Sequence, residues 1–142
     1  MKILLTGPNG LLGRNLLNHL INQGHKINII TRKRQSSNFK ESNNINIYEH
    51  NLSNDQLDLS NAFAGVNAVY HCAAELNDTN IMYKLHVNGT NKLVDEFLKT
   101  QSCQHFIHVS SVGVYGFPTE GLITENYDLA YTNEYERTKL IA

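Results

Sequence analysis

Short apolar segments alternate with longer amphipathic segments from the start of the chain to about residue 110. The apolar segments predict strands at 3–6, 26–31, 45–48, 66–72 and 106–110. In the amphipathic segments apolar side chains recur at helical spacing, which predicts helices at 11–22, 55–63 and 81–99. Alternation of this kind favours parallel strands joined by crossover helices, so the pattern predicts an α/β sandwich.

The remaining segments lack this periodicity. Residues 32–44 are rich in Ser, Asn, Lys and Arg, which predicts a loop with at most a short helix, and residues 113–133 predict a second loop. Gly24 is expected to close the first helix as a C-cap. A last helix is expected from near Tyr135 to Ala142.

Composition narrows the class of protein. A chain of 142 residues fits one domain with a single core. Twelve Lys and Arg against 13 Asp and Glu give a net charge of −1, so no nucleic-acid partner is expected. No apolar run approaches the roughly 20 residues that span a bilayer, and no signal peptide is seen, so we expect no membrane partner and a cytoplasmic location. Cys72, Cys103 and the seven histidines lack metal-ligand spacing, so we expect buried free thiols and no metal site.

Three glycines spaced by three follow the first strand directly, at positions 7, 10 and 13. Phosphate approaches backbone N–H groups closely where no Cβ intervenes, and the positive end of a helix dipole favours the anion. Gly7 would make the turn, Gly10 would admit a pyrophosphate, and Gly13 would let helix and strand pack closely. The alternative interpretation is ordinary turn and cap chemistry.

A serine pair ends the fifth predicted strand, and Tyr135 and Lys139 lie four residues apart on the last predicted helix, where they share one face. A phenol has a pKa near 10, and a neighbouring ammonium stabilises its phenolate, so we expect Lys139 to lower the pKa of Tyr135. A serine hydroxyl at a strand end would hold the substrate oxygen. The alternative is a solvated Tyr-x-x-x-Lys pair with no role.

In their order along the chain, these elements resemble the extended short-chain dehydrogenases/reductases, also called the NAD-dependent epimerase/dehydratase family. Residues 6–13 are similar to the family's T-G-x-x-G-x-x-G element, 50–53 to its acidic-Leu segment, 71–74 to H-x-A-A and 87–91 to N-V-x-G-T. The resemblance covers the whole chain and implies a Rossmann-type, doubly wound sandwich with a mostly parallel sheet. It also implies an oxidoreductase that acts on a small molecule, a nucleotide sugar or a related hydroxyl or carbonyl compound, with epimerisation, dehydration and reduction all open.

The resemblance assigns roles to particular residues. Ser111 would orient the substrate oxygen, Tyr135 would be the acid/base, Lys139 would also bind the nicotinamide ribose, and Asn88 would be the family's helix asparagine. The predicted cofactor-binding residues are Thr6, Gly7, Asn9, Gly10, Leu11, Leu12, Gly13, Arg32, Asn51, Leu52, Cys72, Ala73, Ala74, Tyr135 and Lys139.

Two positions depart from the family pattern. Where NAD-preferring members place an acidic residue for the ribose 2′-OH, this chain has Arg32, which, with Lys33 or Arg14, would pair with a 2′-phosphate. This favours NADP over NAD, and the alternative is a solvated loop charge. Asn51 replaces the usual aspartate and would still accept a bond from the adenine amino group.

Length is the larger departure. Family members continue beyond the Tyr-Lys helix, whereas this sequence ends three residues after Lys139. We therefore expect residues 1–142 to form one NAD(P)-binding Rossmann domain, truncated before the last strands and the substrate region, with a catalytic helix that frays. Two alternatives stay open. One is a non-catalytic NAD(P)-binding module, and the other is a fragment that pairs through an uncovered apolar sheet edge, as a homodimer or with a complementing chain.

Overall fold

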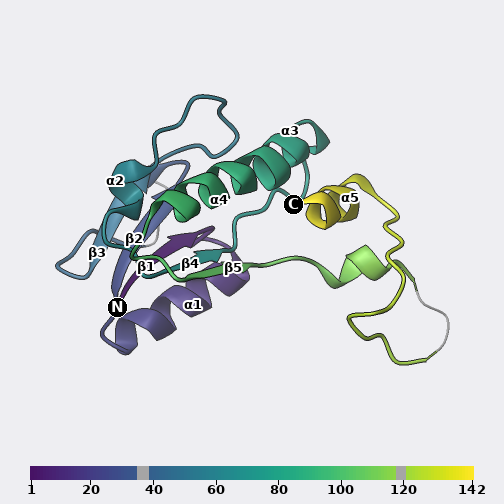
Figure 1. Cartoon of the computed structure of the whole chain (residues 1–142), viewed down its shortest axis with the longest axis horizontal. Helices are drawn as coiled ribbons and strands as arrows, with labels where there is room; N and C mark the ends of the chain where they lie inside the picture. The colour runs from purple at the N-terminus through teal and green to yellow at the C-terminus, as the bar shows by residue number, and fades with distance from the viewer. Residues whose placement is uncertain (35–38, 118–120) are drawn as a thin grey trace.

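The computed structural model describes residues 1–34, 39–117 and 121–142 and contains a five-stranded sheet in the order β3-β2-β1-β4-β5 (Figure 1). Every neighbouring pair in this sheet is parallel. The strands are β1 (Lys2–Thr6), β2 (Lys26–Thr31), β3 (Ile45–Glu49), β4 (Ala68–His71) and β5 (His105–His108). The predicted α/β class with a parallel, Rossmann-type sheet is confirmed.

The strand order reverses beside β1. The chain moves outward from β1 to β2 and β3, and then crosses back to add β4 and β5 on the other side. At the carboxyl end of β1, Thr6 is in register with Ile30 of β2 and His71 of β4. Loops leaving β1 and β4 therefore diverge at this end of the sheet, and an open α/β sheet binds ligands at such a point.

Helices cover both faces of the sheet. Successive residues of a strand point to opposite faces, so each face carries apolar side chains against which a helix can pack. On one face α1 (Leu11–Asn22) packs Leu17 and Leu20 against β1 and β2. On the other face lie α2 (Ser60–Phe63) and α4 (Gly89–Lys99), where Phe63 and Leu93 join a second apolar cluster. Figure 1 shows α1 below the sheet and α4 above it.

The long predicted helix 81–99 exists but is not uniform. It begins two residues earlier, as α3 (Thr79–Tyr83), passes through a π-helical segment, η2 (Lys84–Asn88), and continues as α4. The capping side chain of Asp78 accepts a bond from the backbone N–H of Asn80 at 3.0 Å. Hydrophobic periodicity predicts a helix but cannot reveal one wider turn within it, so the sequence pattern missed η2.

The other departures concern element ends. The helix predicted over 55–63 is confined to α2, whose first N–H, that of Ser60, donates to the carboxylate of Asp58 at 2.9 Å. The fourth and fifth strands, predicted at 66–72 and 106–110, are each shorter in the structure, and β5 begins one residue earlier. Gly24, with φ +78°, follows the end of α1 and donates its N–H to Ile21 O at 2.9 Å, as expected of a glycine that stops a helix.

The C-terminal part of the chain leaves β5 through η3 (Val112–Tyr115), a short 3₁₀ turn within the predicted loop, and ends in α5 (Glu134–Ile141). Asn133 caps α5 by accepting a bond from the N–H of Glu136 at 2.9 Å. Helix α5 packs against α3, η2 and η3. The predicted loops 32–44 and 113–133 lie partly outside the described residues, which exclude 35–38 and 118–120.

Two further expectations concern the surface. Within residues 1–34, 39–117 and 121–142, no helix is both long and apolar enough to cross a bilayer. Strands β3 and β5 form the two sheet edges, and Ile107 on β5 is 38% exposed. The homodimer or complementing chain stays a prediction.

Candidate functional site

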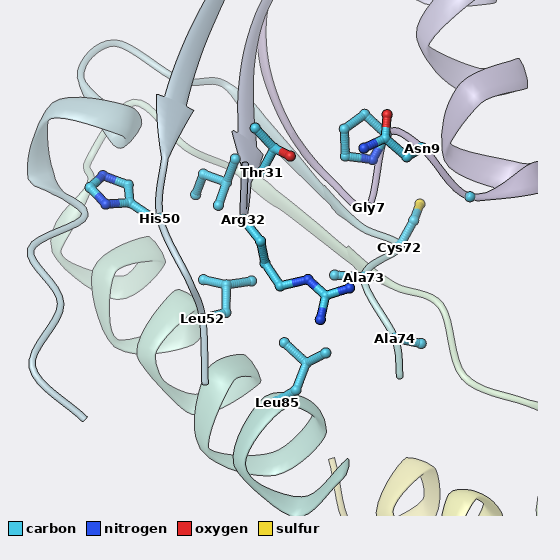
Figure 2. Close-up of a pocket in the computed structure, with 13 residues that line it drawn as sticks. Gly7, Asn9, Thr31, Arg32, His50, Leu52, Cys72, Ala73, Ala74 and Leu85 are labelled. Carbon is cyan, nitrogen blue, oxygen red and sulfur yellow. The ribbon is translucent and has the colours of Figure 1, made fainter. Parts of the chain in front are cut away.

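A cavity of about 190 Å³ opens at the carboxyl ends of β1, β2 and β4 (Figure 2). Eight residues predicted to bind a cofactor line it, namely Gly7, Asn9, Gly10, Arg32, Leu52, Cys72, Ala73 and Ala74. Sequence reasoning missed the other lining residues, which are Pro8, Ile30, Thr31, His50 and Leu85. Four of these five residues lie within two positions of a predicted residue, so widening each motif by one or two positions would have found them. Leu85 belongs to η2, and only tertiary packing brings it to the cavity.

Three glycines shape the turn between β1 and α1. At Gly7, with φ +68°, an added Cβ would lie 2.6 Å from the backbone of Cys72 and Ala73. At Gly13 it would lie 2.1 Å from the carbonyl oxygen of Gly7. At Gly10 the nearest atom would be 3.5 Å away, and Gly10 lines the cavity. Gly7 and Gly13 are thus required by close backbone packing, whereas Gly10 leaves room for a ligand.

Helix α1 starts at this turn without a capping side chain, since its N-cap is Gly10. The side chains of Leu11 and Leu12 are largely exposed and lie outside the cavity lining. The first N–H groups of a helix have no partner within the helix, so they can bind an anion beside Gly10. The arrangement fits the pyrophosphate of a dinucleotide.

Thr6 connects this turn to the loop after β4. Its Oγ1 accepts a bond from the N–H of Ala73 at 3.1 Å and lies 2.6 Å from Nδ1 of His71. Nε2 of the fully buried His71 lies 3.0 Å from Oγ1 of Thr90, which itself donates to His86 O. Thr90 Oγ1 therefore accepts from His71 Nε2–H, and the Thr6 hydroxyl donates to Nδ1. Burial lowers the pKa of His71 to about 3. Thr6 thus lies behind the cavity as a support for Ala73.

Arg32 extends from the end of β2 across the cavity, with its guanidinium towards Ala73 and Ala74 (Figure 2). Its Nη1 lies 3.4 Å from Oε2 of Glu75, and the Arg32 side chain is 59% exposed. The other oxygen of Glu75 accepts bonds from the backbone N–H groups of residues 76, 77 and 78. These bonds, that from Asn77 first, lower the pKa of Glu75. Arg32 thus has an ionised partner, with which a phosphate must compete.

The predicted adenine contact at Asn51 is already occupied by a local bond. Asn51 Oδ1 accepts from the N–H of Ser53 at 3.2 Å and from its hydroxyl at 2.7 Å. This turn buries Leu52, which is 3% exposed and lines the cavity. Asn51 itself is not among the lining residues, so its contact with adenine stays a prediction.

Three of the proposed catalytic residues, Ser111, Tyr135 and Lys139, lie at the start of η3 and on α5, which pack together. None of the three is among the residues that line the cavity. Ser111 caps η3, and its Oγ accepts the N–H of Gly113 at 3.1 Å, a bond that does not use the hydroxyl proton. Tyr135 is half-buried, and its ring forms a T-shaped pair with the ring of His86, with centroids 5.5 Å apart. Lys139 is 3% exposed, and its Nζ lies 3.3 Å from Nε2 of His108.

The expected effect of Lys139 on Tyr135 is not seen in this structure. Burial raises the pKa of Tyr135 rather than lowering it. Burial also lowers the pKa of Lys139 to about 8, and the amine contacts His108. The physical reason is that both side chains lose water on packing, and loss of water opposes the charged form of each.

The predicted helix asparagine raises a question of register. Asn88 ends η2 and is half-buried. Matching Val87, Gly89 and Thr90 to the V, G and T of the motif N-V-x-G-T places His86 at the asparagine position and Asn88 at x. His86 is fully buried and hydrogen-bonded through both ring nitrogens. A role for Asn88 stays a prediction, and the motif's own spacing was the signal that points to His86.

The chain has two cysteines among its reactive groups. Cys103 is buried and Cys72 half-buried, both are free thiols, and burial raises the pKa of each. Among the residues described by the structure, no group of three or more His, Cys, Asp or Glu side chains could hold a metal ion.

A glycine-rich turn leads into a helix at the point where the strand order of the parallel sheet reverses. This arrangement defines a dinucleotide-binding class of α/β fold. The chain belongs to the NAD dependent epimerase/dehydratase family, whose family model matches residues 3–142. This confirms the resemblance found in the sequence.

Individual relatives extend the comparison. The chain is 27% identical to sterol demethylase protein B of Methylococcus capsulatus, covering 100% of this chain and 45% of the relative. It is 30% identical to UDP-glucose 4-epimerase of Bacillus subtilis, covering 99% and 45%. A short-chain dehydrogenase/reductase superfamily protein from Agrobacterium tumefaciens, solved with bound NAD, matches with a TM-score of 0.84 and 28% identity over 99% of this chain and 42% of that one. The chain thus spans less than half the length of these proteins.

Proposed function

We propose that this chain is the NAD(P)-binding domain of an epimerase, dehydratase or reductase that acts on a hydroxyl or carbonyl carbon of a nucleotide sugar or related compound. The observation that carries the proposal is the cavity over Gly7 and Gly10, at the carboxyl ends of β1 and β4. Family membership and a relative named UDP-glucose 4-epimerase support the reaction class and the substrate class.

The residues present fit a dinucleotide. Gly10 leaves open space beside the first N–H groups of α1, where a pyrophosphate would bind. Leu52, Leu85, Ala73 and Ala74 supply apolar lining to the same cavity. When bound, the nicotinamide supplies the hydride acceptor or donor.

The side chains on η3 and α5 would handle the proton. Ser111 Oγ, which already accepts the Gly113 N–H, has its hydroxyl proton available for the substrate oxygen. Tyr135 would take or return the proton of that oxygen as the carbon loses or gains hydride. Lys139 would bind the ribose and stabilise the phenolate through the ammonium protons that its contact with His108 leaves available.

For the cofactor we propose NADP ahead of NAD. Arg32 lies in the cavity where an acidic residue would otherwise bind the ribose 2′-OH, and its exposed guanidinium can pair with a 2′-phosphate. The Agrobacterium tumefaciens relative was solved with bound NAD, so NAD is the alternative.

Titration of the purified chain with NADH and NADPH tests the proposal. Binding of either below millimolar concentration supports it, and absence of binding of both at millimolar concentration overturns it. Arg32→Asp should weaken NADPH binding by about tenfold or more and spare NADH. Lys26→Asp, at the amino end of the same strand, is the matched charge control. Unchanged NADPH affinity in Arg32→Asp would remove Arg32 from the cofactor site.

A second candidate is a dinucleotide-binding module without catalysis. The raised pKa of Tyr135 and the contact of the Lys139 amine with His108 favour it. A panel of carbonyl compounds and nucleotide sugars separates the two functions. Turnover that is lost in Tyr135→Phe supports the enzyme, whereas dinucleotide binding without turnover supports the module.

A further inference from the structure

A buried histidine joins two segments that the proposed mechanism treats separately. His86, in η2, is fully buried. Its Nε2 lies 2.9 Å from the backbone nitrogen of Glu75, in the loop after β4, and its Nδ1 lies 2.8 Å from Oγ1 of Thr138, in α5. The three residues belong to three different segments, so the imidazole is a bridge between them.

The chemistry of the partners determines where the ring proton lies. A backbone N–H can only donate, so Nε2 of His86 must accept from Glu75 and carries no proton. In the neutral ring the proton then lies on Nδ1 and is donated to Thr138. The Thr138 hydroxyl donates in turn to the carbonyl oxygens of Glu134 or Tyr135, at 2.9 and 3.0 Å. Every polar atom of the bridge is satisfied.

The bridge contacts the part of α5 that carries the two proposed catalytic residues, Tyr135 and Lys139. Thr138 directly precedes Lys139 and faces into the protein, where it is fully buried. The ring of Tyr135 packs edge-on against His86 at an angle of 87°. The bonds therefore define how far α5 lies from the loop after β4 and which face it turns inwards.

The wider turn of η2 lies where the bridge begins. An i→i+5 turn changes the direction in which the following side chains point, and such turns occur often at functional sites. On the far side of the bridge, Glu75 holds Arg32 at the cavity. A continuous set of hydrogen bonds and one ion pair therefore leads from the cavity lining to α5.

We propose that His86 is a positioning residue, whose neutral imidazole, protonated at Nδ1, ties α5 to the loop after β4 and so holds Tyr135 and Lys139 beside the dinucleotide cavity. The catalytic roles of Tyr135 and Lys139 rest on the proposed function, whereas the hydrogen bonds of the bridge do not. Acting through Thr138, His86 needs no contact with substrate or cofactor.

The first test is spectroscopic and uses the unsubstituted 142-residue chain. Nitrogen-15 NMR at pH 7 should show His86 protonated at Nδ1, with a ring proton that exchanges slowly with water. A ring protonated at Nε2 or on both nitrogens would overturn the proposal. This measurement also decides the matter should a variant fail to fold.

The second test compares two variants of Thr138. Thr138→Val removes the hydroxyl at nearly constant volume, and with it the bond from His86 Nδ1 and the bond to a helix carbonyl. It should raise amide exchange in α5 by about tenfold or more, while exchange in β1 and β4 stays unchanged. Thr138→Ser keeps the hydroxyl and should restore protection to within about threefold of the parent. Equal protection of α5 in the parent and in Thr138→Val would contradict the bridge.

Dinucleotide titration of the same proteins separates the two proposals. A parent chain that binds neither NADH nor NADPH but shows the Nδ1 proton and the Thr138 effects would remove the proposed function and leave the bridge. A chain that binds dinucleotide but lacks both effects would remove the bridge and leave the proposed function.

Discussion

The amine of Lys139 lies 3.3 Å from Nε2 of His108, at the end of β5, and the lysine side chain is almost completely buried. A buried ammonium is stabilised poorly, which is why the pKa of Lys139 falls to about 8. The buried position of Lys139 thus lowers the stability of the folded chain wherever the amine is charged.

Lys139→Met should therefore stabilise the chain. Methionine has a similar volume and no charge, and we expect the free energy of unfolding at pH 7 to rise by about 1 to 3 kcal/mol, measured by urea unfolding. Because the folded-state pKa is below the unfolded value, the gain should shrink as pH rises from 8 and vanish above about 10.5. Lys99→Met, at a largely exposed site on α4, should change stability by less than about 0.5 kcal/mol. A less stable Lys139→Met protein would contradict this account.

Gly10 and Gly13 should respond differently to the same substitution. An alanine Cβ at Gly13 would clash with the carbonyl of Gly7 at 2.1 Å, so Gly13→Ala should lose about 1 to 3 kcal/mol of unfolding free energy or more. At Gly10, where φ is −70° and the nearest atom would be 3.5 Å away, Gly10→Ala should lose only about 0.5 to 1 kcal/mol, because alanine caps a helix less well than glycine.

Ligand affinity completes that comparison. Gly10→Ala should fold normally yet bind NADH and NADPH about tenfold or more weakly, because its Cβ enters the cavity beside the helix start. Fluorescence titration of the reduced cofactors measures this directly. Undiminished affinity in Gly10→Ala would mean that the pyrophosphate does not bind at this turn.

Acid should destabilise the chain through the buried His71 and His86 and the half-buried His108. Burial lowers the pKa of His71 to about 3 and those of His86 and His108 to about 4. In the unfolded chain the histidines bind protons near pH 6.5. The stability that the neutral rings contribute to the folded chain is therefore complete above that pH and declines as pH falls towards 4. Between pH 6.5 and pH 5 each can remove up to about 2 kcal/mol, which urea unfolding at several pH values would measure. Equal stability at pH 7 and pH 5 would show that the rings are not held neutral.

Glu75→Gln should tune the choice of cofactor. The substitution removes the charge that pairs with Arg32 while keeping an oxygen for the backbone N–H groups of the following loop. We expect NADPH to bind about three to ten times more tightly and NADH to bind equally well, by titration against the parent. Glu41→Gln, which removes the charge of a carboxylate that pairs with Arg34 at 2.7 Å, is the matched control. A parallel gain for NADH would show that Arg32 does not read the 2′-phosphate.

Local sequence patterns were sufficient to predict the architecture of the sheet and the position of the glycine turn. The alternation of apolar and amphipathic segments predicted the parallel sheet, and the glycines at 7, 10 and 13 predicted the turn where the cavity lies. These inferences succeed because strand period, helix period and the need for a missing Cβ are properties of adjacent residues. Family membership was likewise visible in short motifs and is confirmed.

The amino-acid sequence alone therefore determined the order of strands and main helices, the family and the end of the sheet at which the cavity lies. Tertiary structure alone decided that His86 bridges to Thr138, 52 residues away, and that the Lys139 amine contacts His108. It also reversed the expected shift of the Tyr135 pKa. The reason is that these features depend on burial and on how helices pack across the sheet, including one wider turn in η2, and neither is encoded in the spacing of neighbouring residues.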